Sequence, residues 1–227
     1  MSWPPVTKDA PDEGRVTKPA DPSATEGQRS GRFGAGDEKF DVISYEELFG
    51  NKNPVELEIG CGKGKFLTER ARENPDTNFL GIDYVSKFRR KGETKVGKCD
   101  LANIRFLKAE ARKFLTEAVP PASIAVVHIY FPDPWPKRRH HRRRTVTADF
   151  LKLIHSRLAP SGLLEIATDD GAYYAEIKEA MVATAELWEN VRETKDERIF
   201  GGTMKTNYEL KFEAEGRTLH YAELRKR

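Results

Sequence analysis

Short apolar runs alternate with segments of helical periodicity along most of the chain, and this alternation limits the possible folds more than any other feature. The apolar runs have the length and the aliphatic content of buried strands. They lie at residues 55–59, 78–83, 103–110, 123–131 and 162–170, and the helical patterns lie at residues 65–75, 85–98, 111–118, 147–160 and 172–187. Because such alternation builds βαβ units with right-handed crossovers, we predict an α/β protein with a mostly parallel central sheet and helices on both faces.

The two ends of the chain depart from this pattern. Two further strands are expected at residues 188–191 and between residues 208 and 224, with an antiparallel C-terminal strand. Residues 1–36 are rich in Pro, Gly, Ser and charged residues and have few aliphatic side chains. Such a segment cannot bury enough apolar surface to offset the entropy that ordering removes. We therefore expect a disordered tail over residues 1–36 and a single domain over residues 37–227, with a core that begins near Phe40.

The composition argues against several classes of protein. With 38% hydrophobic and 33% charged residues among 227, the chain is expected to be a soluble globular protein. No apolar run approaches the roughly 18 residues of a membrane helix, and the first residues lack the apolar core of a secretion signal. The two cysteines, Cys61 and Cys99, have neither metal-ligand nor disulfide-framework spacing. We expect a reduced, cytoplasmic location, no membrane association and no bound metal.

A glycine-rich loop, residues 60–64 (GCGKG), joins the first predicted strand to the first predicted helix. Glycine lets the backbone turn tightly and approach a ligand closely. Because Lys65 occupies the last position of the dinucleotide-binding spacing G-x-G-x-x-G, the loop argues against a nicotinamide-dependent oxidoreductase. With the preceding Glu58 it reads E-x-G-x-G-x-G, which resembles the first motif of class I S-adenosylmethionine-dependent methyltransferases. The resemblance implies that four residues surround the amino-acid end of that cofactor: Glu58, Gly60, Gly62 and Gly64.

Two acidic residues stand at the ends of later strands, and parallel sheets bind their ligands at these ends. Asp83 closes the second predicted strand, where a carboxylate can accept hydrogen bonds from both hydroxyls of a ribose. NAD enzymes use the same contact, so Asp83 alone does not distinguish the two cofactors. Glu110 ends the third predicted strand. Class I methyltransferases place an adenine-binding acid there, so the resemblance implies that Glu110 contacts the base of the cofactor.

Residues 131–144 (FPDPWPKRRHHRRR) combine a stiff, proline-rich turn with a basic run. The last eight of them include six Lys and Arg residues, whereas the whole chain has a net charge of only +3, so the rest of the chain is net negative. Such a concentration of positive charge is typical of a site for a polyanion, and a solvated basic loop is the alternative. Asp133, the acidic residue of this segment, could recognise a ligand or cap a turn, and Trp135 could stack on a base or pack.

The stretch DPWPKRRHHRRR (residues 133–144) resembles the signature of the tRNA (guanine-N7)-methyltransferase family. The resemblance extends from about residue 40 to the C-terminus and includes ATDD (167–170) and TNYE (206–209), with departures from the family pattern at Asp170 and Asn207. It implies a Rossmann-like class I methyltransferase domain, S-adenosyl-L-methionine as the methyl donor and tRNA as the substrate. The acceptor would be N7 of the guanine at position 46 in the variable loop, and the product would be 7-methylguanosine.

The resemblance also implies roles for individual residues. Asp133 is expected to be the catalytic residue at the reactive centre and also to contact the cofactor. The implied cofactor-binding residues are Glu58, Gly60, Gly62, Gly64, Asp83, Glu110 and Asp133. The implied substrate-binding residues are Lys137, Asp169, Thr206, Asn207, Tyr208 and Glu209. The basic run from Lys137 to Arg144 is expected to hold tRNA phosphates, and the side chains expected to contact the substrate are Lys137, Arg138, Arg139, Arg142 and Arg143.

The chemistry of N7 explains why no nucleophilic triad is expected. Guanine N7 carries a lone pair and no proton, so its methylation needs no general base. We expect catalysis by orientation, with Asp133 first and Asp169 second accepting hydrogen bonds from guanine N1–H and the exocyclic amine. Other interpretations remain: another RNA or a non-nucleic-acid acceptor, or a binding protein that has lost catalysis. The sequence also leaves open a monomer, a homodimer or a second subunit.

Overall fold

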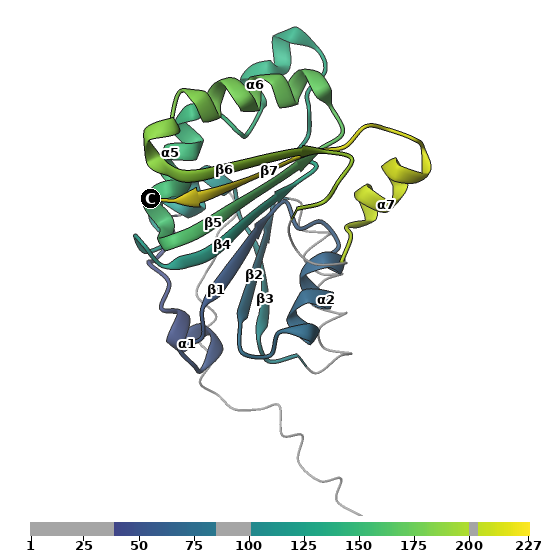
Figure 1. Ribbon diagram of the computed structural model, residues 1–227. Coiled ribbons are helices and arrows are strands. Elements are labelled where there is room, and N and C mark those ends of the chain that lie inside the picture. Colours follow the sequence, from purple (N-terminus) through teal and green to yellow (C-terminus); the bar gives the residue numbers. More distant parts are fainter. Residues whose placement is uncertain (1–38, 85–100, 200–203) are drawn as a thin grey trace, which may run out of the picture. The chain divides into compact units, whose positions relative to one another are not determined.

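A sheet of seven strands lies at the centre of the residues that the computed structural model describes, which are 39–84, 101–199 and 204–227. The strand order is β3-β2-β1-β4-β5-β7-β6 (Figure 1). The strands are β1 (Val55–Ile59), β2 (Asn78–Asp83), β3 (Ile104–Lys108), β4 (Ile124–Tyr130), β5 (Leu158–Thr168), β6 (Trp188–Lys195) and β7 (His220–Lys226). Neighbouring strands from β1 to β5 are parallel, and β7 runs antiparallel between β5 and β6. The predicted α/β fold is confirmed, including its antiparallel C-terminal strand.

Helices pack on both faces of this sheet, as the alternation of strands and helices predicts. They are α1 (Tyr45–Phe49), α2 (Lys65–Glu73), α4 (Ala111–Glu117), α5 (Ala148–Arg157), α6 (Gly171–Val182) and α7 (Asn207–Ala214), with the short 3-10 helices η1 (Arg138–Arg143) and η2 (Ala185–Leu187). Helices α4, α5 and α6 bury their apolar side chains against the face that carries Leu57 and Val127. Helices α2 and α7 contribute to the core on the opposite face, which carries Phe79 and Ile104 (Figure 1).

Phe106 of β3 lies in the core on the α2 side, and its ring leaves no room for a side chain at two glycine positions. A Cβ built on Gly81 of β2 would lie 2.6 Å from the Phe106 ring, and one built on Gly64, before α2, would lie 2.4 Å from it. Both distances are shorter than a real Cβ contact, so the ring occupies the space that a side chain at either position needs. Gly64 also has a φ of 66°, which favours glycine for conformational reasons. Glycine at these positions therefore lets the loop, β2 and β3 approach one another closely.

The C-terminal region differs from the prediction. The strand expected between residues 208 and 224 begins only at His220, and residues 207–214 form helix α7 instead. The TNYE stretch explains the helix, because the Thr206 side chain accepts a hydrogen bond from the Glu209 amide while the Glu209 side chain accepts one from the Thr206 amide. This reciprocal capping box is a helix start signal, which the resemblance of the same residues to a substrate motif had obscured.

Some predictions fall on residues that the structure does not describe. The tail over residues 1–36 and the helix over residues 85–98 lie outside the described residues. The described residues belong to one compact unit, Arg32–Arg227, and the division of the chain into a tail and one domain stays a prediction. Within the described parts of the chain, no helix has the length and apolar character that crossing a membrane requires.

Candidate active site

A cavity of about 560 Å³ opens where β1, β2 and β4 end. Three segments from distant parts of the sequence form its wall: the glycine loop after β1, residues 131–133 after β4, and the first turn of α7. Parallel strands all point their carboxyl ends to the same edge, which is why these segments meet there. A volume of this size is typical of a small-molecule site.

The glycine loop reaches the cavity through backbone conformations that favour glycine. Gly60, Gly62 and Gly64 have φ angles of 81°, 54° and 66°. The Gly60 amide donates a hydrogen bond to the Ile82 carbonyl (2.8 Å), which ties the loop to the end of β2. The Gly62 amide donates to Asp83 Oδ2 (3.0 Å). Asp83 is half-buried and lines the cavity, so the same side chain both orders the loop and faces a ligand.

Glu58 provides a buried carboxylate in the cavity wall. Its side chain lies on the sheet face that carries α2, the residue is only 4% exposed, and its Oε2 has no hydrogen-bond partner among the described residues. Burial raises the pKa of Glu58 to about 7, with nearby Asp83 adding to the increase and His128 opposing it. A buried acceptor without a donor carries a desolvation penalty. The cavity therefore favours a ligand that brings a cationic N–H group to Glu58.

Asp133 lies in the cavity wall and also caps a turn. Its Oδ1 accepts a hydrogen bond from the Trp135 amide (3.1 Å), and the residue is exposed. The turn is tightly folded, because Phe131 and Trp135 have φ angles of 51° and 46°, which non-glycine residues seldom adopt. The turn-capping and ligand-facing interpretations of Asp133 are thus compatible, since the turn aims the carboxylate at the cavity.

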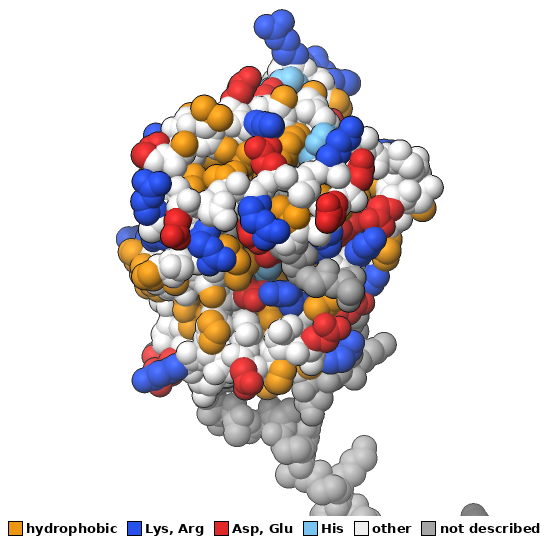
Figure 2. All heavy atoms as spheres, viewed as in Figure 1, with side chains coloured by type: hydrophobic (Ala, Val, Ile, Leu, Met, Phe, Trp, Pro, Cys, Tyr) orange, Lys and Arg blue, Asp and Glu red, His pale blue; other side chains and the backbone are white. Residues whose placement is uncertain are grey.

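The basic run forms η1, and its members have two different environments. Arg138, Arg139, Arg142 and Arg143 are exposed, and the Arg143 guanidinium lies 4.8 Å from the centre of the Trp135 ring. Trp135 therefore packs within the loop. In Figure 2, blue Lys and Arg side chains project at the top of the view, over the teal segment that follows β4 in Figure 1. This surface is available to a polyanion.

Arg144 differs from the rest of the run, and its expected role in holding phosphates is wrong. The residue is 5% exposed, and its Nε donates to the Pro134 carbonyl (2.7 Å). Its Nη1 lies 2.8 Å from the Glu176 carboxylate of α6, and its guanidinium lies over the Tyr173 ring. Arg144 faces inward and anchors the basic segment to α6.

Gly64, Lys137 and the four exposed arginines of η1 do not line the cavity, and three predicted acidic site residues, Glu110, Asp169 and Glu209, do not line it either. Glu110 caps the start of α4, where its carboxylate accepts from the amides of Arg112 (3.0 Å) and Lys113 (2.7 Å). Asp169 accepts a hydrogen bond from Arg217 Nη1 (2.8 Å). The roles expected for these residues toward a cofactor or a substrate stay predictions.

Glu209 is the third such residue, and it supports the cavity from inside. It is 0% exposed and accepts hydrogen bonds from Tyr221 Oη (2.9 Å), from the Thr206 amide (3.2 Å) and from the Arg198 guanidinium. The other residues of the TNYE stretch, Thr206 to Tyr208, do line the cavity. Glu209 thus fixes the start of α7 so that its neighbours face the site.

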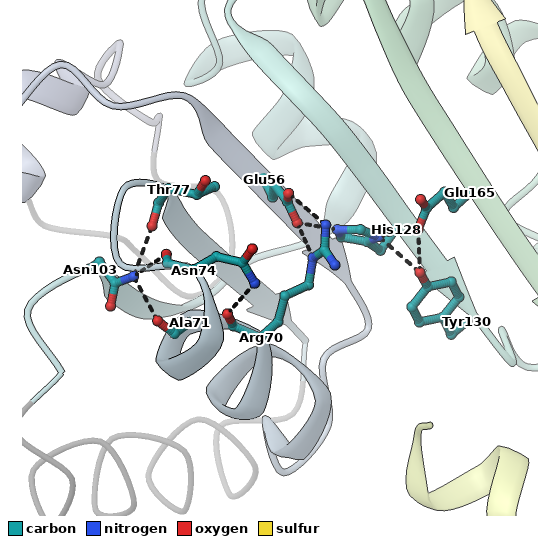
Figure 3. A network of polar contacts seen from close by, with 9 residues as sticks. All are labelled: Glu56, Arg70, Ala71, Asn74, Thr77, Asn103, His128, Tyr130 and Glu165. Atoms are coloured by element: carbon teal, nitrogen blue, oxygen red, sulfur yellow. Dashed lines mark hydrogen bonds and ion pairs between the residues drawn. The ribbon is translucent and has the colours of Figure 1, made fainter. Parts of the chain in front are cut away.

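A buried polar network, defined by Glu56, Arg70, His128, Tyr130 and Glu165, lies beneath the cavity and was not foreseen from the sequence (Figure 3). His128 of β4 lies between two carboxylates, 2.9 Å from Glu56 Oε2 and 2.8 Å from Glu165 Oε2. Tyr130 donates to Glu165 (2.5 Å), and Arg70 of α2 binds Glu56. The available signal was a charged or titratable residue at an interior position of each of three strands, Glu56 in β1, His128 in β4 and Glu165 in β5, but only the sheet register reveals that they meet.

The comparisons with known proteins agree with this geometry. A family model described as "Putative methyltransferase" matches residues 52–222. The chain is 36% identical to the tRNA (guanine-N(7)-)-methyltransferase of Geobacter metallireducens over 84% of this chain and 90% of that protein. It is 35% identical to the protein of the same name from Geobacillus thermodenitrificans, over 79% of this chain and 82% of the relative.

Among solved structures, the fold is similar to that of the 16S rRNA methyltransferase KamB. The TM-score is 0.58 at 15% identity, over 84% of this chain and 97% of that one. At this identity the likeness concerns the fold alone, and the family follows from the sequence relatives. From the extent and identity of those matches, the chain belongs to the tRNA (guanine-N(7)-)-methyltransferase family.

Proposed function

We propose that the protein transfers a methyl group from S-adenosyl-L-methionine to N7 of a guanine in tRNA and so produces 7-methylguanosine. Family membership supports the reaction. The observation that carries the proposal at the level of the site is the shared cavity, in which the glycine loop and the turn around Asp133 face each other across one space. Two further parts of the proposal have other grounds: the variable-loop guanine as acceptor rests on the sequence resemblance, and a cytoplasmic location rests on the composition and the spacing of the cysteines.

The residues of the cavity fit this cofactor. Glu58 would bind the ammonium group at the amino-acid end, which supplies the donor that its buried Oε2 lacks among the described residues. The glycine loop would enclose the same end of the cofactor, and Asp83 would accept hydrogen bonds from the ribose hydroxyls. The cofactor, when bound, supplies an electrophilic methyl group on a sulfonium. Lys63 and Lys65 line the cavity too and offer positive charge for the cofactor's carboxylate.

The protein's part in the reaction is to orient the acceptor. Guanine N7 is already nucleophilic, so the protein has no proton to remove from it. Asp133 would hold the base by accepting hydrogen bonds from N1–H and the exocyclic amine, a donor pair that adenine lacks. Methylation places positive charge on the purine, and a nearby carboxylate stabilises that charge. Orientation of N7 toward the methyl group and this electrostatic contribution together account for catalysis.

The exposed arginines of η1 would deliver the tRNA to the site. Phosphate contacts give affinity and fix the position of a nucleic acid without reading its sequence. Arg144 holds the segment to α6, so the exposed arginines next to it have a defined position on the protein. Asp133 lies in the same segment and would read the base that those phosphate contacts position.

Methyl transfer from labelled S-adenosylmethionine to bulk tRNA, followed by nucleoside analysis, tests the proposal. Label in 7-methylguanosine is the expected result, and tRNA with a variable-loop guanine replaced by adenine should lose it. Label in another nucleoside would contradict the role given to Asp133. Failure to bind S-adenosylhomocysteine would contradict the cofactor site.

A further inference from the structure

The buried polar network holds His128 in an unusual position. Both ring nitrogens face a carboxylate oxygen: Nε2 lies 2.9 Å from Glu56 and Nδ1 lies 2.8 Å from Glu165. A neutral imidazole has one N–H donor and one acceptor, so it can satisfy only one of these contacts. The imidazolium satisfies both. His128 is 0% exposed, so this geometry favours a positively charged imidazolium in the interior of the sheet at neutral pH.

The pKa values agree with this protonation state. Burial would lower the pKa of His128, but Glu165 and Glu56 outweigh burial and raise it to about 9. Burial would raise the pKa of Glu56, but hydrogen bonds from His128 and Arg70 lower it to about 2. Burial would also raise the pKa of Glu165, but the charge and hydrogen bond of His128 and the hydrogen bond from Tyr130 lower it. At neutral pH the network therefore contains two carboxylates and two cations.

His128 also stands beside Glu58. The two residues are partners in the parallel register of β1 and β4, so their side chains project from the same face of neighbouring strands, which lie about 4.8 Å apart. Glu58 lines the cavity while His128 lies beneath it. A buried carboxylate favours its neutral form unless a positive charge compensates it. The imidazolium is the cation of the network closest to Glu58 in the register.

The other groups around Glu58 do not replace this charge. Asp83 and the Cys61 thiol face it from the loop side and β2, and neither is cationic. Tyr130 of β4 carries a hydroxyl that donates to Glu165, and Arg70 of α2 is engaged by Glu56. Arg198 lies over the Tyr130 ring and binds Glu209. Lys63 and Lys65 line the same cavity, but the charges that shift the pKa of Glu58 are those of His128 and Asp83.

We propose that His128 is a positioning residue for the cofactor: its imidazolium, fixed between Glu56 and Glu165, favours the ionised form of Glu58 and so strengthens binding of the cofactor's ammonium group in the cavity. The inference rests on the proposed function, because it takes Glu58 as the ammonium-binding residue. It adds a requirement that the family resemblance does not contain, namely a buried countercharge on the strand next to the glycine loop. A purely structural network would stabilise the sheet without discriminating between the two ends of the cofactor.

Two ligands separate the charge effect from structural damage. S-adenosylhomocysteine carries the ammonium group, and 5′-methylthioadenosine carries the same nucleoside without the amino-acid end. In His128→Gln the pKa of Glu58 is expected to rise, so the ionised carboxylate that binds the ammonium group forms only at a higher pH. At about pH 7, a rise of one unit in the pKa of Glu58 from its value of about 7 lowers its ionised fraction about fivefold, so this variant should bind S-adenosylhomocysteine about fivefold more weakly. Its affinity for 5′-methylthioadenosine should stay within about twofold of the wild-type value, as calorimetric titration would show.

Arg70→Gln is the matched control, because it removes a cation of the same network that binds Glu56 and leaves the contacts of His128 with Glu56 and Glu165 in place. The pH midpoint of S-adenosylhomocysteine binding should rise in His128→Gln and stay level in Arg70→Gln. An equal rise in both variants, or equal weakening of both ligands in His128→Gln, would overturn the inference. Should His128→Gln fail to fold, His128→Asn takes its place, with the same expected and contradicting results. Absence of S-adenosylhomocysteine binding in the wild type would instead refute the proposed function.

Discussion

Glu58 is the residue of the cavity whose burial and ionisation most directly determine what the cavity can bind. Its carboxylate is buried, one oxygen lacks a partner among the described residues, and its pKa is raised to about 7. Such a group changes its charge within the physiological range, so it responds both to pH and to the arrival of a cation. Binding at this site is therefore expected to report the ionisation of Glu58 directly.

Binding of S-adenosylhomocysteine should strengthen as the pH rises through about 7, because the ligand's ammonium group pairs with the ionised form of Glu58. Glu58→Gln should weaken binding at about pH 8 by tenfold or more and abolish this pH dependence. Calorimetric titration across the pH range measures both effects. Glu117→Gln alters a carboxylate that accepts the Phe40 amide far from the cavity and should behave like the wild type. An unchanged pH dependence in Glu58→Gln would refute the assignment.

Asp133→Ala should reduce turnover by about a hundredfold while changing cofactor affinity much less, because the carboxylate would act on the base and on charge that develops during transfer. Steady-state kinetics with tRNA, together with equilibrium binding of S-adenosylhomocysteine, separates the two quantities. Asp133→Asn is the informative control, since its side-chain oxygen can still accept the Trp135 amide and cap the turn. Full turnover in Asp133→Asn would show that Asp133 caps the turn and that its negative charge has no role in the reaction.

The basic residues in and directly after η1 have two different roles: some are exposed and available to bind a ligand, and one anchors the segment to α6. Four arginines of the segment are exposed, whereas Arg144, just after it, is buried against Pro134, Tyr173 and Glu176. A sequence of consecutive basic residues does not reveal this division, because periodicity within a 3-10 turn and contacts with α6 decide it. The run as a whole is nevertheless held to one place on the molecule.

The double variant Arg138→Ala/Arg139→Ala should weaken tRNA binding and make it less sensitive to salt. Each phosphate contact that is lost should reduce the slope of log affinity against log salt by about one. Binding titrations at several salt concentrations measure the slope. Arg192→Ala removes an exposed arginine of β6 that pairs with Glu223 and should leave the slope as it is. A double variant with the wild-type slope would exclude these two arginines from the phosphate contacts.

Sequence patterns predicted the elements of the sheet better than those of the C-terminal region. Aliphatic runs predicted β1 to β5 because strands in the middle of a parallel sheet are largely buried on both faces, as in β2, where five of the six residues are buried. Helix α7 was missed because its signal is a local capping box, and the same four residues also resembled a substrate motif. Position at a strand end sufficed to bring Glu58, Asp83 and Asp133 to one cavity. The network around His128 depends on strand order and register, which the pattern of one strand does not contain.

At the scale of the whole molecule, the buried charges connect strands that are far apart in the sequence. The network joins β1, α2, β4 and β5 through Glu56, Arg70, His128 and Glu165 (Figure 3). Removing one member of such a group leaves an uncompensated buried charge, which is more destabilising than the absence of the whole group. Stability should therefore depend on pH wherever a member of the network changes its protonation.

The free energy of unfolding should decline at alkaline pH in a manner that depends on His128. Its folded pKa of about 9 lies above the ordinary value of 6.5, so its contribution is complete below about 6.5 and is lost as the pH rises through about 9. The difference corresponds to at most about 3 kcal/mol. Urea unfolding at several pH values measures the decline, and His128→Gln should remove this part of it. Parallel curves for the two proteins would contradict a raised pKa.

Phe106 and Gly81 also limit the order in which descendants of this sequence can change. A side chain at position 81 collides with the ring at 106, so Gly81→Ala alone should destabilise the fold by about 1–3 kcal/mol. Phe106→Leu opens a space that the new methyl group can use, and the double variant should recover part of the loss, as a thermodynamic cycle of unfolding energies would reveal. A lineage that loses the glycine must therefore first replace the ring with a smaller side chain. The same two substitutions, taken in the opposite order, pass through a poorly folded ancestor.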